Sequence, residues 1–291
     1  MNNLKKNIKL AKHAGFCYGV KRAVETTKKI KEENPSRFVF VLGELIHNSQ
    51  VISDLEKIGI KTVETLPEAT EGICVIRSHG ASCRVVDEIR NKGFEIVDLT
   101  CPDVKKAQEE AILLAKEGFL LIIVGTSEHP EVVAIRANAQ MYSDNVYVIS
   151  DAKSVAQYED IIKKHGKIGV VVQTTQRIEN LKEIVNYLVP LAKELKIFNT
   201  ICASTTLRQN EARKIAKEAD LMIVVGSKKS ANTYHLAEIL SNITNTIHIE
   251  DEEDFQKFNE KIENADYIGV TAGASTPEYI IERVINKLNE Y

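Results

Sequence analysis

The chain has 291 residues, of which 44% are hydrophobic and 27% charged, an ordinary balance for a globular protein with room for two or three small domains. Its 38 Lys and Arg residues against 41 Asp and Glu residues give a formal net charge of −3, which argues against a nucleic-acid-binding protein. No apolar run approaches the roughly 18 residues of a membrane span, and residues 1–12 lack the apolar stretch of a secretory signal. We therefore expect a cytoplasmic protein.

Short apolar runs predict strands along the whole chain, and charged, amphipathic segments between them predict helices. Residues 104–116, 178–195 and 208–217 are among the predicted helical segments. This alternation favours an α/β fold with mainly parallel sheets. The predicted strands are 38–42, 73–76, 95–99, 119–124, 146–149, 168–172, 221–225 and 267–270.

Three segments of the chain follow one plan. Each begins with a cysteine, continues with a helical stretch and a strand that ends in glycine, and has a polar residue four positions after that glycine. The cysteines are Cys17, Cys101 and Cys202, and the polar residues are His47, His129 and Ser230. A second strand in each segment ends in a polar cluster, "RSHG" at 77–80, "QTT" at 173–175 and "AGAST" at 272–276. Because these features keep their order three times, we interpret them as an internal repeat.

The repeat predicts an α/β protein of three pseudo-repeated lobes, with small, mainly parallel sheets around a central cleft. The predicted lobes are 19–101, 102–198 and 199–291, the last packed with the N-terminal segment 1–18. Ligands of parallel α/β units bind beyond the carboxyl ends of the strands, where the polar clusters are expected. Thr174 and Ser275 each follow their cysteine by 73 residues and are predicted to be equivalent. A second interpretation, which does not exclude phosphate binding, is that both residues cap the helices that follow them.

The five cysteines are an odd number and lie far apart, which argues against a disulfide framework and suits a reducing compartment. Cys17, Cys101 and Cys202 occupy equivalent points of the repeat, so we interpret them as metal ligands. Cys74 and Cys83 are interpreted as core residues. Three thiolates suit zinc with a further ligand, or a 4Fe–4S cluster that keeps one iron open for a substrate oxygen. The composition leaves both metals open.

Nine strings carry a resemblance to a known family. They are "GFCYGVKRAV", "GELIHN", "RSHG", "DLTCPDVKKA", "EHPEV", "VVQTT", "ICASTTLRQ", "VVGSKKSANTYHL" and "VTAGASTPE", in that order. Together they closely resemble the 4-hydroxy-3-methylbut-2-enyl diphosphate reductase family, from about Leu10 to the end of the chain. The resemblance implies an iron–sulfur oxidoreductase of the last step of the non-mevalonate isoprenoid pathway. Such an enzyme removes an allylic hydroxyl as water in a two-electron reduction and releases isopentenyl and dimethylallyl diphosphates.

The resemblance also implies the roles of the site residues. The ligands of a 4Fe–4S cluster with one iron not ligated by protein match Cys17, Cys101 and Cys202. The catalytic residues match Glu131 as the proton donor, Thr174 near the substrate hydroxyl, and His129. The substrate-binding residues match His47, His79, His129, Thr174, Ser230, Asn232 and Ser275. One position departs from the family, which often has a second serine where this chain has Ala231.

The expected partners are a small allylic diphosphate and an electron donor of the ferredoxin or flavodoxin type, with no nucleic acid and no membrane. Residues 1–31 carry nine Lys and Arg residues against the single acid Glu25, so this stretch is a candidate docking site for an acidic carrier. Two alternatives remain at this stage. One is a zinc-dependent hydrolase or lyase that acts on a phosphorylated metabolite, and the other is an iron–sulfur sensor without catalysis.

Overall fold

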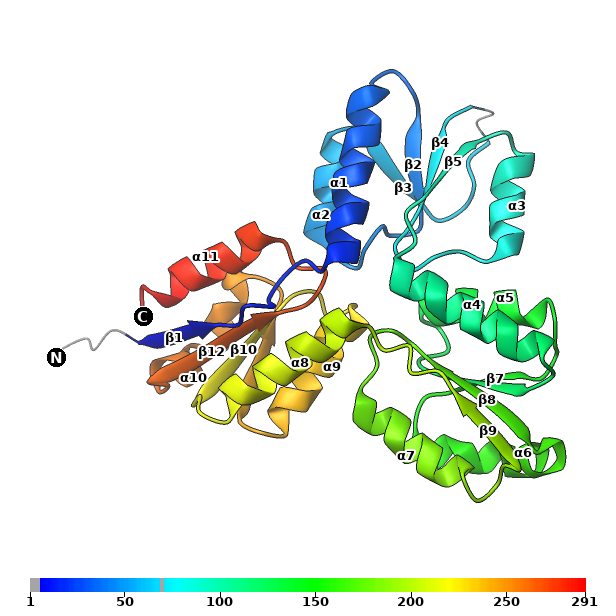
Figure 1. Ribbon diagram of the computed structural model, residues 1–291. Helices are drawn as coiled ribbons and strands as arrows, with labels where there is room; N and C mark the ends of the chain where they lie inside the picture. The colour runs from blue at the N-terminus through cyan, green and yellow to red at the C-terminus, as the bar shows by residue number, and fades with distance from the viewer. Residues whose placement is uncertain (1–5, 69–70) are drawn as a thin grey trace. The chain divides into compact units, whose positions relative to one another are not determined.

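Three small parallel sheets carry the fold of the computed structural model, which describes residues 6–68 and 71–291 (Figure 1). In this described part each sheet has four strands, and every strand pair is parallel. The prediction of an α/β fold with three small parallel sheets is therefore confirmed.

The contacts divide the chain into two compact units, which we describe separately. The middle unit comprises Arg22–Leu45 and Leu55–Cys202. The terminal unit comprises the described residues up to Lys21 together with Ile46–Asp54 and Ala203–Tyr291. The three lobe boundaries expected from the repeat stay a prediction.

The first sheet of the middle unit has the strand order β3-β2-β4-β5. Its strands are β2 (Val39–Leu42), β3 (Ile60–Val63), β4 (Ile73–Ile76) and β5 (Glu95–Asp98). The helices of this part of the chain are α1 (Tyr18–Glu33), α2 (Ser49–Lys57) and α3 (Cys83–Asn91). Phe40 on the central strand β2 lies in the core, where its ring contacts Phe94 at a centroid distance of 4.9 Å.

The second sheet of the middle unit has the order β7-β6-β8-β9. Its strands are β6 (Leu120–Val124), β7 (Val146–Ile149), β8 (Lys167–Val172) and β9 (Glu194–Ile197). Its helices are α4 (Pro102–Lys116), α5 (Pro130–Gln140), the 3-10 helix η1 (Ala152–Tyr158), α6 (Glu159–His165) and α7 (Ile178–Leu188). Leu121 and Ile123 pack into one core, whereas Leu120, Ile122 and Val124 pack into another on the opposite face. Because β6 is buried on both faces, its sequence is a continuous apolar run.

The terminal unit contains the third sheet, in the order β1-β12-β10-β11. Its strands are β1 (Asn7–Leu10), β10 (Leu221–Val225), β11 (Asn245–Ile249) and β12 (Tyr267–Ala272). Its helices are α8 (Ala203–Ala216), α9 (Ala231–Ser241), the 3-10 helix η2 (Glu252–Lys257), α10 (Asn259–Glu263) and α11 (Glu278–Leu288). Counted from β11, the order matches the other two sheets, with the early strand β1 in the place of β5 and β9. The start of the chain therefore completes the last repeat.

The backbone hydrogen bonds repeat from sheet to sheet. A glycine directly follows one central strand of each sheet, namely β2, β6 or β10. Its N–H donates to the carbonyl oxygen of the last residue of the neighbouring edge strand. The three bonds are Gly43 to Val63 (2.8 Å), Gly125 to Ile149 (3.1 Å) and Gly226 to Ile249 (2.8 Å). The internal repeat is thus confirmed in the hydrogen bonds as well as in the strand order.

The same comparison corrects one predicted equivalence. The N–H groups of Cys101, Cys202 and Cys17 donate to the carbonyl oxygens of Ser78, Thr174 and Ala274, respectively. Thr174 is therefore equivalent to Ala274, and the predicted pairing of Thr174 with Ser275 is wrong by one residue. The equal spacing of 73 residues misled because the stretch between Cys202 and the loop after β12 is one residue shorter than its counterpart after Cys101.

Other differences from the predicted elements concern segments with alternating or charged sequences. The strands β1, β3, β9 and β11 were not among those predicted. The helix predicted over 178–195 ends at Leu188, and the last two residues of the predicted range belong to strand β9.

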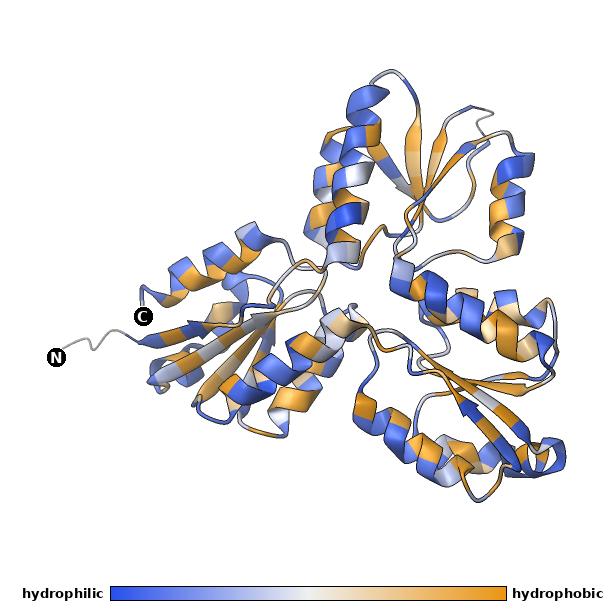
Figure 2. Ribbon diagram, in the orientation of Figure 1, coloured by the Kyte–Doolittle hydropathy of each residue, from blue (hydrophilic) through white to orange (hydrophobic). Residues whose placement is uncertain are grey.

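Figure 2 shows apolar central strands and helices that are apolar on one side only, as expected for helices that cover sheets. None of the helices in residues 6–68 and 71–291 has the length and apolar character needed to span a bilayer.

Candidate active site

The three candidate ligand cysteines each stand immediately before a helix. Cys101 is the N-cap of α4, and Cys17 and Cys202 directly precede α1 and α8. Each is partly exposed, and all five cysteines, which lie in the described residues, are outside disulfides. The Sγ atom of Cys17 accepts the N–H of Val20 at 3.5 Å. A helix N-terminus favours a thiolate, so these positions suit soft metal ions.

The two remaining cysteines differ from each other. Cys74 lies on β4 with no exposed surface, and burial raises the pKa of its thiol to about 12. The prediction of a core residue is therefore confirmed for Cys74. The prediction is wrong for Cys83, which is exposed. Cys83 is the first residue of the amphipathic helix α3 and lies on its exposed side.

Glu131 and Thr174 form a buried pair in the middle unit. Glu131 lies in the first turn of α5 and is 1% exposed, and Thr174 follows β8. The N–H of Thr174 donates to Oε1 of Glu131 at 2.6 Å, and the Thr174 hydroxyl lies 2.8 Å from Oε2. The two contacts fix the carboxyl group against a hydroxyl that can pass a proton on. The arrangement suits general acid catalysis.

Burial raises the pKa of Glu131 from 4.5 to about 7, although the hydrogen bonds from Thr174 favour the charged carboxylate. The nearby carboxylate of Asp103 adds to the rise. Glu131 can therefore hold a proton near neutral pH, which an exposed glutamate cannot.

The raised pKa of Glu131 has a consequence for stability. Between the unfolded value of 4.5 and the folded value of about 7, the folded protein binds more protons, so stability falls as pH rises. We expect the free energy of unfolding of Glu131→Gln, relative to the wild type, to rise by roughly 3 kcal/mol between about pH 4 and about pH 8. Urea unfolding of both proteins across this range measures the difference. If the free energies of unfolding of the two proteins changed in parallel with pH, the raised pKa would be contradicted.

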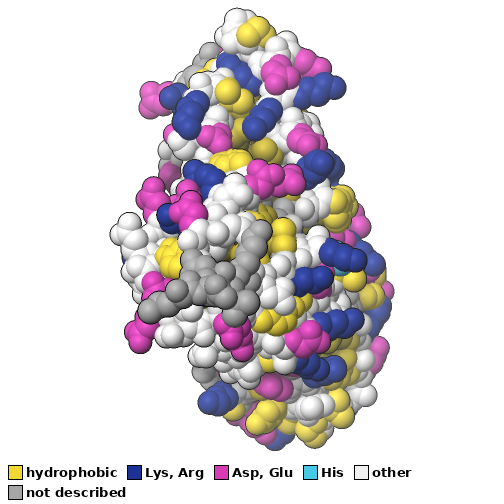
Figure 3. All heavy atoms as spheres, turned by 90° about the vertical axis from the view of Figure 1, so that its left-hand side faces the viewer, with side chains coloured by type: hydrophobic (Ala, Val, Ile, Leu, Met, Phe, Trp, Pro, Cys, Tyr) yellow, Lys and Arg dark blue, Asp and Glu magenta, His cyan; other side chains and the backbone are white. Residues whose placement is uncertain are grey.

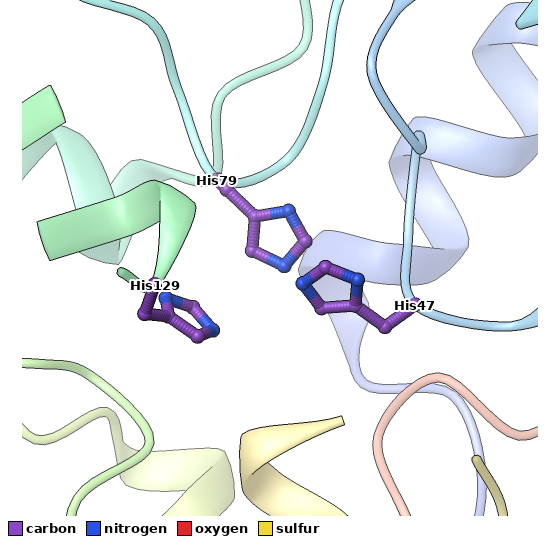
Figure 4. A group of neighbouring side chains, drawn as sticks. All are labelled: His47, His79 and His129. Carbon is purple, nitrogen blue, oxygen red and sulfur yellow. The ribbon is translucent and has the colours of Figure 1, made fainter. Parts of the chain in front are cut away.

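His129 and His79 lie next to each other in the middle unit. His129 is the N-cap of α5, and its Nδ1 accepts the N–H of Glu131 at 3.3 Å. Its ring stands nearly perpendicular to that of His79 at a centroid distance of 5.4 Å (Figure 4). Because Nδ1 is an acceptor, the neutral His129 ring carries its proton on Nε2 and can donate there.

The terminal unit holds four further candidates. The hydroxyl of Ser275, in the loop after β12, donates to the carbonyl oxygen of His47 at 3.2 Å. His47, also drawn in Figure 4, lies in the segment that precedes α2. Neither Ser275 nor Thr174 caps the helix that follows it, since the N-caps of α11 and α7 are Pro277 and Arg177. The capping alternative is therefore wrong for both residues.

Ser230 and Asn232 stand at the start of α9. Ser230 is the N-cap, and its hydroxyl accepts the N–H of Thr233 at 3.4 Å. Asn232 is 4% exposed, and its Nδ2 has no hydrogen-bond acceptor in the described part of the chain. Gly226 leads into this turn with a φ of +138°, and a Cβ there would clash with the Thr276 hydroxyl. A buried amide donor at a helix N-terminus fits an anionic oxygen such as that of a phosphate.

The predicted site residues thus divide between the two units. His79, His129, Glu131, Thr174, Cys101 and Cys202 belong to the middle unit, and Cys17, His47, Ser230, Asn232 and Ser275 belong to the terminal unit. Gln173 was quoted within "QTT" without a role. It is fully buried, accepts the N–H of Thr126 and donates to the hydroxyl of Thr175, both at 3.0 Å. It therefore joins the loops that follow β6 and β8, and its place in the repeated polar cluster was the available signal.

The comparisons with known proteins cover nearly the whole chain. A family model described as "LytB protein" matches residues 8–289. The chain is 42% identical over 282 residues to the 4-hydroxy-3-methylbut-2-enyl diphosphate reductase of Syntrophotalea carbinolica, across 97% of this chain and 98% of that protein. It is 43% identical over 284 residues to the protein of the same name from Trichlorobacter lovleyi, across 97% of each chain.

Two solved structures are similar as well. A structure of (E)-4-hydroxy-3-methyl-but-2-enyl diphosphate reductase, the terminal enzyme of the non-mevalonate pathway, has a TM-score of 0.71 and 36% identity, over 98% of this chain and 100% of that chain. The E-1-hydroxy-2-methyl-but-2-enyl-4-diphosphate reductase of Plasmodium falciparum has a TM-score of 0.87 and 28% identity, over 97% and 87%. The family expected from the nine strings is confirmed, and the chain belongs to the LytB family, whose matched relatives are 4-hydroxy-3-methylbut-2-enyl diphosphate reductases.

Proposed function

We propose that this protein reduces 4-hydroxy-3-methylbut-2-enyl diphosphate to isopentenyl and dimethylallyl diphosphates. The reaction consumes two electrons and two protons, breaks the allylic C–O bond, forms a C–H bond and releases water. Within a chain of this family, the buried pair of Glu131 and Thr174 carries the proposal, since loss of hydroxide requires a proton held in a dry site near neutral pH.

Membership of the family implies an iron–sulfur cofactor, and we propose a 4Fe–4S cluster on Cys17, Cys101 and Cys202 with one iron that lacks a protein ligand. Three partly exposed thiols at helix starts support this assignment, whereas the raised pKa of the Cys74 thiol does not suit a ligand. When bound, the cluster supplies electrons and a Lewis-acidic iron.

Proton delivery is assigned to the Glu131 carboxyl and the Thr174 hydroxyl. The protonated carboxyl donates from Oε2 to Oγ1 of Thr174, across the 2.8 Å that separates them. The Thr174 hydroxyl then donates its own proton toward the substrate hydroxyl, which leaves as water. The backbone N–H of Thr174 stays on Oε1 and stabilises the carboxylate that remains.

The diphosphate is assigned to the polar residues His47, His79, Ser230, Asn232 and Ser275, with His129 facing the substrate. The acceptor-free amide of Asn232 and the N-terminus of α9 support a phosphate at this point. Imidazole N–H groups and the side-chain donors of Ser230, Asn232 and Ser275 can each donate a hydrogen bond to a phosphate oxygen.

The electron donor is proposed to be a small acidic carrier of the ferredoxin or flavodoxin type. The nine Lys and Arg residues within residues 1–31 support docking of such a carrier. A reducing compartment such as the cytoplasm suits the reduced thiols.

On the face drawn in Figure 3, basic and acidic side chains are interspersed, unlike the one-signed stripe of a nucleic-acid-binding surface.

The test is anaerobic turnover of the allylic diphosphate with a chemically reduced carrier, with both diphosphate products followed by chromatography. Formation of the two products, together with oxidation of two equivalents of carrier for each substrate, supports the proposal. A protein that contains iron and sulfide but consumes no carrier in the presence of this substrate would refute it.

Replacement of Ala231 by serine tests the diphosphate assignment, because it should strengthen substrate binding. Ala231 is the first residue of α9, where a serine hydroxyl can donate to a phosphate oxygen. One such hydrogen bond is worth roughly 0.5–1.5 kcal/mol, so KM should fall about 2- to 10-fold with kcat unchanged. Steady-state kinetics measures both constants. An unchanged KM would place the diphosphate elsewhere.

A further inference from the structure

An arginine holds the loop before Cys17 in the terminal unit. Nη2 of Arg208, on α8, donates to the carbonyl oxygen of Gly15 at 2.6 Å. Arg208 is only 2% exposed, although a buried guanidinium group is costly unless it is well hydrogen-bonded. Gly15 has a φ of +86°, and a Cβ there would come within 3.0 Å of Ile281, so the loop is tight. The arginine therefore fixes a tight turn that requires glycine, two residues before Cys17.

A second arginine does the same before Cys101 in the middle unit. Nη2 of Arg22, on α1, donates to the carbonyl oxygens of Thr100 at 2.6 Å and Leu99 at 3.2 Å. Asp98 also binds this loop, since its Oδ1 accepts the N–H of Thr100 at 2.9 Å. The two residues before Cys101 are thus both bound by the Arg22 guanidinium group, and Thr100 is bound by Asp98 as well.

The two contacts follow one pattern along the chain. Arg208 lies six residues after Cys202, and Arg22 lies five residues after Cys17. The helix that follows one cysteine therefore carries the arginine that holds the loop before another. The loop before Cys202 is closed by a neutral contact instead, in which the Thr200 hydroxyl accepts the N–H of Val172 at 2.8 Å.

We propose that Arg208 and Arg22 are positioning residues, which set Cys17 and Cys101, respectively, for the iron–sulfur group. Each cysteine is fixed at its own N–H, by Ala274 or Ser78, and through the arginine at the residues before it. Charge-assisted hydrogen bonds to the loop hold the backbone more firmly than neutral bonds do. The sulfur therefore keeps one position when iron arrives. This inference rests on the proposed role of these cysteines as ligands.

The test compares Arg208→Met and Arg22→Met with the wild-type holoprotein. Arg84→Met is the control, because the Arg84 side chain is 88% exposed and pairs with Glu88 on its own helix. Iron and sulfide content, the rate of iron release to a chelator and the melting temperature are measured for each protein. Iodoacetamide present during chelation labels each cysteine as the iron leaves, and mass spectrometry gives the order of labelling.

We expect iron release to become about 10- to 100-fold faster in both methionine variants, as for other residues that orient metal ligands. Cys17 should be labelled first in Arg208→Met, and Cys101 first in Arg22→Met. Iron release from Arg22→Lys should be slower than from Arg22→Met, because an ammonium group can still donate to one carbonyl oxygen. The Arg84→Met protein should behave as the wild type.

An unchanged rate of iron release would overturn the inference. An unchanged order of labelling would overturn it as well. So would iron release that exposes all three cysteines at equal rates and accompanies a fall in melting temperature. Failure of the proposed reaction is a separate outcome, since a wild-type protein that holds the cluster without reducing the allylic diphosphate leaves these comparisons intact.

Discussion

Replacement of Glu131 by glutamine is expected to lower kcat by about 10²- to 10⁴-fold while iron and sulfide content and substrate binding stay unchanged. Glutamine preserves the size of the side chain and can still accept the N–H of Thr174, so the loop after β8 keeps its place. It cannot release a proton to the Thr174 hydroxyl. The C–O bond must then break without protonation of the departing oxygen. Anaerobic steady-state kinetics, with iron and sulfide assays on the same samples, measures the effect.

The matched control is Glu128→Gln in the loop just before α5, since Glu128 is exposed and pairs with its neighbour Ser127. It should turn over as the wild type does. In the wild type, activity should fall as pH rises above about 7, where Glu131 loses its proton, and this fall should vanish in Glu131→Gln. Near-normal turnover of Glu131→Gln at neutral pH would remove Glu131 from the mechanism.

Replacement of Cys101 by serine is expected to abolish turnover and to remove most of the brown iron–sulfur absorbance. Serine differs from cysteine by one atom, but its hydroxyl is a far weaker ligand for iron than a thiolate. Cys101 is the N-cap of α4, where serine is well tolerated, so the fold should persist. Iron, sulfide and visible absorbance after anaerobic purification measure the loss, and far-ultraviolet circular dichroism confirms the fold.

Cys83→Ser provides the control for this experiment, because Cys83 is exposed at the start of α3 and is not among the proposed ligands. It should retain full iron content and turnover. A Cys101→Ser protein with wild-type iron and sulfide would show that the cluster has other ligands.

The central strands could be predicted from the sequence, and the reason is their burial. Strands such as β6 and β10 are buried on both faces, so they are unbroken apolar runs of five residues. The missed strands β1 and β9 lie at sheet edges and are partly exposed, with lysines in their short sequences. Such segments carry little periodicity, and only pairing with a neighbouring strand makes them strands. The predicted helix that overran Leu188 failed for this reason.

Less of the site could be predicted, because its chemistry depends on contacts between distant segments. The repeat singled out the three cysteines and the polar loops by spacing alone. Spacing could not reveal that Glu131 is buried against Thr174, which lies 43 residues further along the chain, or that burial raises its pKa. The arginine contacts at Gly15 and Leu99 join residues 193 and 77 positions apart, and the sequence does not show which distant loop each arginine binds.

The most direct test of the proposed iron–sulfur reductase is anaerobic purification followed by quantitation of iron and acid-labile sulfide and by addition of the allylic diphosphate with reduced carrier. The account predicts a brown protein with about four iron and four sulfide per chain, which forms isopentenyl and dimethylallyl diphosphates. A colourless protein that contains zinc, or a brown protein that leaves the diphosphate unchanged, would contradict it.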